Sequence, residues 1–223
     1  MNMFSCKEVK EVVISLMGEQ KVKDKIYVAG GIVPWILSGN DSGRKHGDID
    51  IVVEKDDMGT VREFLRDKGY YKVEFDSMSF PFNVDQTDHG VEVLIKGIPV
   101  NFAPFEVRGN DITQRNFSIA ELGGFNALLT ATLKDISVED YITDYKLDDG
   151  LEIGSYTVEV VRAAKEKSDR EKDLVDLREI DRMGIDYERY SRVKPSVQDM
   201  KIDFIAPSRR RGCRRCPSPP RAP

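Results

Sequence analysis

The spacing of apolar residues along this chain alternates between a helical period and a strand period, and these changes mark the predicted elements. An apolar residue at every third or fourth position over residues 5–18 predicts an amphipathic helix, with Ser5 as its N-cap and Gly18 at its end. The same pattern over residues 56–68 and 171–183 predicts two more helices. Each of these helices is expected to present one apolar face to a core.

The helical pattern is strongest over residues 155–184, which read as two helices divided near Asp169. In the second of these helices, Leu174, Leu177 and Ile180 follow one another at a spacing of three residues. Side chains at this spacing share a helix face, so we expect them to pack against the rest of the fold.

Short segments rich in Val, Ile, Tyr and Phe between the helices predict strands. Their ranges are 26–29, 48–53, 70–75, 91–95, 98–102, 130–136 and 141–145. A tight turn at Lys96 and Gly97 is predicted to join two of them. This order of elements predicts an α+β fold: a mixed sheet with flanking helices and with the C-terminal helices packed alongside.

Composition places the chain among soluble globular proteins, with 40% hydrophobic and 33% charged residues. No apolar run reaches the length of about 20 residues that a membrane helix needs, so no membrane partner is expected. The first residues also lack the basic-then-apolar order of a signal peptide. A cytoplasmic location is therefore the expectation.

The charge distribution separates the last residues from the rest of the chain. Residues 207–223 contain six Arg and no acid, so removing them changes the net charge from −5 to −11 for residues 1–206. An acidic body does not favour a broad RNA-binding surface. We interpret 1–206 as one domain, with a catalytic core at about 20–120 and a helical part at about 155–195. The Arg- and Pro-rich tail is expected to be disordered and is interpreted as a cloning remnant or an out-of-frame read-through, with an RNA- or partner-binding arm as the alternative.

The segment YVAGGIVPWILSGNDSGRKHGDIDIVV, residues 27–53, carries the candidate chemistry. Asp48 and Asp50 are two positions apart on a predicted strand, so their carboxylates share one face while Ile49 and Ile51 point into the core. Two carboxylates held together repel each other unless a cation lies between them. Mg²⁺ is the natural choice, because it prefers oxygen ligands and commonly binds one or two carboxylates together with substrate phosphates.

A glycine pair stands on the other side of this segment. Gly30 and Gly31 enter a short helix that carries Pro34 in its first turn and Trp35, the only Trp of the chain. Glycines leave backbone N–H groups accessible, which suits the binding of phosphate. Trp35 is interpreted as a core anchor between helix and sheet, with contact to a nucleotide base as the alternative.

The glycine pair, the Trp-bearing helix and the sequence R-x-H-G-D-x-D, in this order, resemble the polymerase-β-like nucleotidyltransferase superfamily. The resemblance covers roughly residues 26–180. It is greatest to the small bacterial branch that includes antibiotic nucleotidyltransferases, and the chain is also similar to the head domain of CCA-adding enzymes. Such a resemblance implies a nucleotidyltransferase-like mixed sheet, a nucleoside triphosphate such as ATP as substrate, and a third acid on a later strand.

Glu92 is the candidate for this third acid, because it stands between Val91 and Val93 in an apolar strand. We expect it to join Asp48 and Asp50 as a catalytic residue and metal ligand. The alternative is a solvent-facing Glu on an edge strand. Asp85, Asp88 and Glu106 are weaker candidates because their surroundings are polar or interrupted by Pro.

Basic residues complete the predicted nucleotide site. The segment K-x-x-R-x-K-D-x-x-D-L, which begins at Lys167, is similar to one found late in the small bacterial nucleotidyltransferases. Lys172, in the first turn of its helix, could reach triphosphate oxygens; a solvated helix face is the alternative. Arg44 is a second candidate for compensating phosphate charge, and His46 could orient the loop or contact phosphate.

These features predict an enzyme that moves a nucleoside monophosphate from an NTP to a hydroxyl acceptor, with two Mg²⁺ ions at Asp48, Asp50 and Glu92. The acceptor is expected to be a small molecule such as an antibiotic, or else a protein or an RNA. RNA is not favoured. A non-catalytic nucleotide-binding or interaction domain on the same fold is the second hypothesis. A purely structural or Ca²⁺-binding Asp48–Asp50 pair is the third, and a homodimer is left open.

Overall fold

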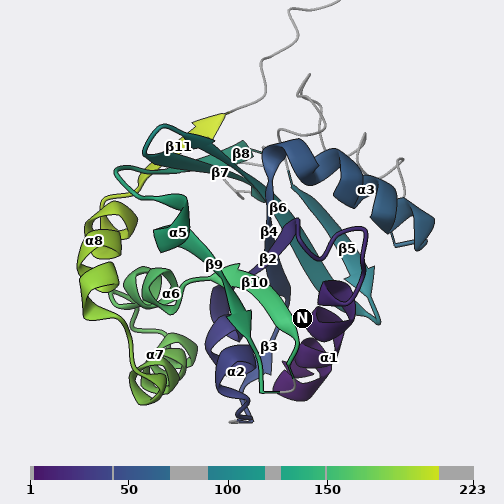
Figure 1. Cartoon of the computed structure of the whole chain (residues 1–223), viewed down its shortest axis with the longest axis horizontal. Helices are drawn as coiled ribbons and strands as arrows, with labels where there is room; N and C mark the ends of the chain where they lie inside the picture. Colours follow the sequence, from purple (N-terminus) through teal and green to yellow (C-terminus); the bar gives the residue numbers. More distant parts are fainter. Residues whose placement is uncertain (1–2, 42, 71–89, 119–126, 149, 206–223) are drawn as a thin grey trace, which may run out of the picture.

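A computed structural model describes residues 3–41, 43–70, 90–118, 127–148 and 150–205 of the chain (Figure 1). The predicted strand at 70–75, beyond its first residue, and the tail at 207–223 lie outside these ranges. The strands are β1 (Phe4–Ser5), β2 (Ile26–Ala29), β3 (Lys45–His46), β4 (Ile49–Glu54), β5 (Val91–Ile95), β6 (Ile98–Arg108), β7 (Asp111–Ser118), β8 (Ala127–Leu133), β9 (Ile142–Lys146), β10 (Glu152–Tyr156) and β11 (Lys201–Ile205).

The helices include those predicted at 5–18, 56–68 and 171–183, together with α5 and α8. They are α1 (Cys6–Met17), the 3₁₀ turn η1 (Gly30–Ile32), α2 (Val33–Ser38), the 3₁₀ turn η2 (Lys55–Asp57), α3 (Met58–Asp67), α5 (Val138–Tyr141), α6 (Val158–Lys165), α7 (Glu171–Met183) and α8 (Tyr187–Gln198). The predicted start of α1 is confirmed: Ser5 caps it, and Glu8 returns a hydrogen bond to the Ser5 backbone, which completes a capping box. Gly39 ends α2 in the left-handed conformation.

One mixed sheet organises the described residues, in the order β11-β8-β7-β6-β4-β2-β10-β9, with β5 paired to β6. Strand β4 lies in its middle, antiparallel to β2 and parallel to β6. The register places Asp50 between Ala29 of β2 and Asn101 of β6. Residues opposite one another in a sheet point to the same face, so this row fixes the surroundings of Asp50.

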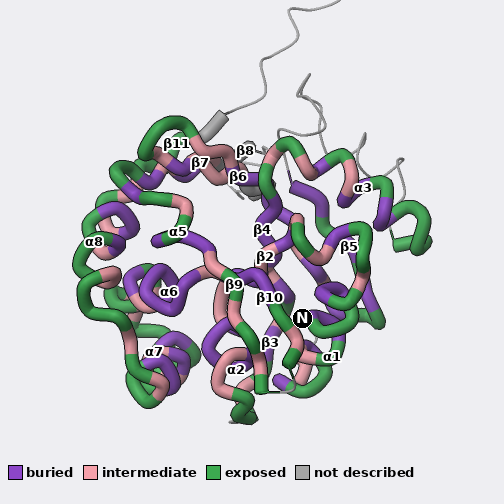
Figure 2. Tube along the Cα trace, viewed as in Figure 1, coloured by how far each residue is buried: buried purple, intermediate pink, exposed green. Residues whose placement is uncertain are grey.

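The two faces of the sheet are covered by different helices (Figure 1). Helices α1, α2 and α3 pack on the face that holds Val28, Ile51 and Phe102. Helices α5, α6 and α8 pack on the opposite face, against Val52 and Phe105. Figure 2 shows the buried residues of the central strands between these two groups. Asp50 belongs to the second face, because its neighbours Ile49 and Ile51 point to the first.

The predicted hairpin between β5 and β6 is confirmed. Lys96 and Gly97 both have positive φ, 50° and 81°, as a two-residue hairpin turn of this hand requires. The strand that follows is longer than predicted, because β6 continues from Ile98 to Arg108 and pairs first with β5 and then with β7.

Two sequence predictions in the second half of the chain need correction. Helix α7 forms over its predicted residues, but Leu174 is 45% exposed, while Asp173, Asp176 and Glu179 are buried together with Ile180. Ion pairs make this acidic face compatible with burial, as described below. The predicted strand at 141–145 begins one residue later, because α5 occupies Val138–Tyr141 before β9 starts.

No helix within the described ranges is both long enough and apolar enough to cross a membrane.

A close approach within the sheet can be tested at Gly154 of β10. A Cβ there would lie 2.6 Å from Tyr27 Cδ1 and 3.2 Å from the Ile26 carbonyl oxygen. We expect Gly154→Ala to lower the free energy of unfolding by about 1–3 kcal/mol, because the neighbours must shift. Urea denaturation measures the change.

Gly59→Ala is the matched control. Nothing lies within 4 Å of a Cβ at this position in α3, so we expect about 0.5–1 kcal/mol of added stability from the helix preference of Ala. Similar stability of the two variants would contradict the packing described for Gly154.

Candidate functional site

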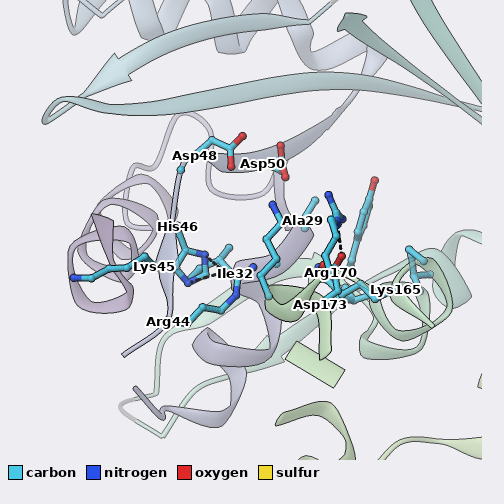
Figure 3. A pocket seen from close by; sticks show the side chains of 18 of the residues that line it. Ala29, Ile32, Arg44, Lys45, His46, Asp48, Asp50, Lys165, Arg170 and Asp173 are labelled. Carbon is cyan, nitrogen blue, oxygen red and sulfur yellow. Dashed lines mark hydrogen bonds and ion pairs between the residues drawn. The ribbon is translucent and has the colours of Figure 1, made fainter. Parts of the chain in front are cut away.

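A pocket of about 430 Å³ opens where the β2–η1 turn, strands β3 and β4, and helices α6 and α7 meet (Figure 3). Its volume lies in the range of small-molecule sites, about 300–1,000 Å³. Seven of the residues that the sequence analysis selects line it: Gly30, Gly31, Arg44, His46, Asp48, Asp50 and Lys172. These residues come from three separate stretches of the chain, so the fold brings them together.

The two aspartates stand next to each other at one end of the pocket (Figure 3). Asp48 is exposed, and Asp50 is partly buried at the start of β4. Burial and the neighbouring Asp48 raise the pKa of Asp50 from 3.8 to about 6, against the opposing effects of Lys165, a hydrogen bond from Asn101, and Lys172. The site therefore favours a proton or another positive charge at Asp50.

At both glycine positions, neighbouring side chains leave no room for a Cβ atom. Gly30 has φ of +70°, and a Cβ there would stand 2.4 Å from Asp50 Oδ2. A Cβ on Gly31 would stand 2.6 Å from Arg44 Nη2 and 3.0 Å from Asp176 Oδ2. The glycine pair thus lets the turn approach an acid and a base of the pocket at the same time.

The carboxylate of Asp176, fully buried on α7, connects three other segments. Its Oδ1 accepts a hydrogen bond from Trp35 Nε1 of α2 at 2.8 Å. The same oxygen forms an ion pair with Arg44 Nε at 2.8 Å, and Lys165 Nζ of α6 lies 3.0 Å from Oδ2. Trp35 is 2% exposed and does not line the pocket, which confirms its interpretation as a core anchor.

Asp173, one turn earlier on α7 and also fully buried, organises a second group of partners. It pairs with Lys165 at 2.5 Å and with Arg170 Nε at 2.6 Å, and it accepts a hydrogen bond from Ser168 Oγ at 2.6 Å. Burial alone would raise the pKa of Asp173, but these donors outweigh it and hold the pKa well below its usual range. The carboxylate is therefore charged at any ordinary pH.

These ion pairs use most of the positive charge around the pocket. Arg44 is paired with Asp176, and Lys165 is shared between the two buried aspartates of α7. Among the described residues, Lys45 and Lys172 line the pocket and form no ion pair. Of the two, Lys172 is the one near enough to Asp50 to lower the pKa of that acid, so it is the cation best placed to meet an anionic ligand beside Asp50.

His46 is buried and neutral. Burial, Arg44 and Lys165 lower its pKa from 6.5 to about 3, so the ring is uncharged at neutral pH. Arg44 Nη1 donates toward His46 Nδ1 at 2.5 Å, which holds the guanidinium at the wall of the pocket. His46 thus contacts Arg44, and its expected roles in orienting the loop or contacting phosphate stay predictions.

Tyr156 adds a hydroxyl network that the sequence analysis does not anticipate. It lines the pocket, and its hydroxyl lies 2.6 Å from that of Tyr141 and donates to Gln114 Oε1 at 3.0 Å. Burial raises the pKa of both tyrosines, so both remain neutral donors. The network ties β7 and β10 together beneath the pocket.

Glu92 does not join the two aspartates. It lies on β5, outside the pocket lining, because β6 runs between β5 and β4. Glu92 pairs with Asn101, which in turn pairs with Asp50, so the acids share a face but stand two strands apart. In the described part of the chain, no group of three His, Cys, Asp or Glu is placed to hold a metal ion. The described residues therefore do not show the expected cluster of Asp48, Asp50 and Glu92.

The sequence analysis assigns no role to Lys165 or Tyr156, and it includes Asp173 and Asp176 only as members of the segment that begins at Lys167. The two aspartates could have been found from their own spacing, since Asp173, Asp176 and Glu179 recur every three residues on one helix face. A row of acidic side chains on a helix is normally interpreted as exposed to solvent, because charges are rarely buried without partners. Only the positions of Arg44 and Lys165 in space show that partners exist.

The fold of this chain is similar to that of solved antibiotic nucleotidyltransferases. One similar solved structure is the lincosamide antibiotic adenylyltransferase LnuA with lincomycin bound, at 19% identity and a TM-score of 0.52, covering 82% of this chain and 100% of that one. Another is the antibiotic-resistance factor ANT(2'')-Ia, at 12% identity and a TM-score of 0.50, covering 88% and 94%. A scan against protein-family models and a search of curated proteins find no match.

The buried carboxylate on α7 gives a stability prediction. We expect Asp176→Asn to lower the free energy of unfolding by about 3–5 kcal/mol, because Arg44 and Lys165 lose the charge that compensates them inside the protein. Urea denaturation at neutral pH measures the loss. Glu171→Gln, an exposed acid on the same helix, should change stability by less than about 0.5 kcal/mol. Equal effects would contradict the described network.

The raised pKa of Asp50 gives a pH prediction for the ligand-free protein. Because folding favours the protonated acid, its contribution to stability is fully present below pH 3.8 and is lost as the pH rises through about 6. Asp50→Asn should therefore be more stable than the wild type at pH 7.5 by about 1–3 kcal/mol, with the difference shrinking toward pH 4.

Urea denaturation at a series of pH values checks this prediction. Asp56→Asn, an exposed acid outside the pocket, is the control and should follow the wild type throughout. A stability gain in Asp50→Asn that does not vary with pH would point to packing instead of charge.

Proposed function

We propose that this protein is an Mg²⁺-dependent nucleotidyltransferase that moves a nucleoside monophosphate from an NTP to the hydroxyl group of a small molecule. The observation that carries the proposal is the pocket in which Asp48 and Asp50 lie beside the Gly30–Gly31 turn and Lys172, which has no ion pair among the described residues. Two carboxylates, a tight glycine turn and a cation are the groups that a metal-bound triphosphate requires.

The donor set fits one Mg²⁺ ion at Asp48 and Asp50. The raised pKa of Asp50 reports that a positive charge is favoured there, and Mg²⁺ commonly binds one or two carboxylates and completes its shell with phosphate and water. When bound, such an ion neutralises part of the triphosphate charge.

The remaining roles fall to the chain itself. Lys172 neutralises phosphate oxygens, and the backbone at Gly30 and Gly31 contacts them from below. Arg44 and Lys165, held by Asp176, keep the wall of the pocket in a fixed position. In the reaction, the acceptor oxygen forms a bond to the α-phosphorus, the bond to the bridging oxygen breaks, and pyrophosphate leaves with the electron pair. The acceptor proton passes to solvent or a nearby base.

A small-molecule acceptor is favoured by the solved structures with this fold, one of which holds lincomycin. The acidic body of the chain also gives little attraction for RNA. An antibiotic-like polyhydroxyl compound is therefore the first acceptor class to test.

A non-catalytic nucleotide-binding domain is the second candidate. One observation favours it: among the described residues, the two aspartates of the pocket lack a third carboxylate nearby. NTP binding without pyrophosphate release, for every acceptor offered, would support this candidate.

The first test measures Mg²⁺-dependent binding of ATP, GTP, CTP and UTP by thermal shift and calorimetry, followed by pyrophosphate release with a panel of lincosamides and aminoglycosides. We expect Asp48→Asn to abolish the Mg²⁺-dependent part of binding. Lys172→Gln should weaken binding about tenfold, because one charge-assisted contact to phosphate is lost.

Matched controls keep the charge change but move it out of the pocket. Asp56→Asn and Lys167→Gln are both exposed and should bind NTP like the wild type. NTP binding that is insensitive to Mg²⁺ and to Asp48→Asn would refute the proposed function.

A further inference from the structure

One row of side chains crosses the sheet at the pocket, and it contains an amide where a further carboxylate would be needed. The row runs Ala29, Asp50, Asn101, Glu92 over strands β2, β4, β6 and β5. Neighbouring strands are about 4.8 Å apart, so the backbone of Asn101 is one spacing from Asp50 and that of Glu92 is two spacings, or about 10 Å. Asn101 is therefore the nearest same-face neighbour of Asp50 on β6.

Two catalytic metal ions bind only where their ligands allow a short distance between the ions. Such ions lie about 3.5–4 Å apart, and each carboxylate oxygen binds at about 2.1 Å. A carboxylate at position 101 would reach a second ion beside Asp50, whereas Glu92 starts a full strand further away. This geometry agrees with the absence of a three-acid cluster from the described residues.

A side-chain hydrogen bond joins Asn101 to Asp50, so the amide N–H is turned toward that carboxylate. An amide is neutral and adds no carboxylate oxygen to a metal site. In the strand register the amide of Asn101 therefore stands where a third carboxylate beside Asp50 would have to stand.

We propose that this site holds a single divalent ion at Asp48 and Asp50, and that Asn101 is a positioning residue which holds Asp50 in place of a second ion. Glu92 has no part in metal binding. The inference deepens the proposed function and rests on it for the identity of the nucleotide, but the metal count can be measured separately.

The experiment counts bound Mn²⁺ by the loss of its free EPR signal, using the whole chain. In the wild type we expect weak binding of Mn²⁺ alone, and one equivalent in the presence of an α,β-methylene NTP analogue. Asn101→Asp should bind Mn²⁺ alone at least about tenfold more tightly, because a third carboxylate adds ligand charge, and should take a second equivalent with the analogue. Circular dichroism checks that each variant is folded.

Two controls isolate the effect. Asn110→Asp makes the same charge change at an exposed position after β6, away from the pocket, and should leave Mn²⁺ binding unchanged. Glu92→Gln should also leave it unchanged, whereas Asp48→Asn should remove it.

Two equivalents of Mn²⁺ in the wild type would overturn the inference, and so would a loss of binding in Glu92→Gln. Neither result depends on whether Asn101→Asp folds. A folded Asn101→Asp that gains no affinity would overturn it as well. If Asn101→Asp gains its Mn²⁺ site while no form of the protein binds the analogue, the role of Asn101 stands and the proposed function fails.

Discussion

The geometry of the pocket depends on the carboxylate of Asp176, which does not itself line the pocket. Asp176 is fully buried on α7 and joins Trp35 of α2, Arg44 of the loop before β3, and Lys165 of α6. Arg44 and Lys165 line the pocket, and α2 directly follows the η1 turn that lines it. Lys165 and Asp176 are far from Trp35 and Arg44 along the chain. A buried charge with partners on three elements fixes their relative positions, because moving any one of them would leave a charge without compensation.

This constraint explains how positive charge is distributed around the pocket. Arg44 and Lys165 are paired with acids, while Lys172 forms no ion pair among the described residues. Burial and, after it, the neighbouring Asp48 raise the pKa of Asp50. A buried acid with a perturbed pKa in a pocket is typical of a functional site.

The sequence predicted the local elements well wherever a short-range signal existed. Ser5 and Gly18 marked the limits of α1, and Lys96 with Gly97 marked the hairpin of β5 and β6. The prediction failed for the buried face of α7, where a period of three suggested an apolar stripe but the acids point inward. A hydrophobic pattern cannot reveal this case, since burial of an acid depends on bases that are distant in the chain.

By itself, the sequence determined that two aspartates on one strand follow a glycine turn and a short helix, because strand periodicity and glycine freedom are local properties. Only the tertiary structure decided what stands next to Asp50. The strand register places the amide of Asn101 next to Asp50 and puts Glu92 one strand further from Asp50. Strand order and register arise from packing of the whole sheet, and the alternation within a single strand carries no information about which strand lies beside it.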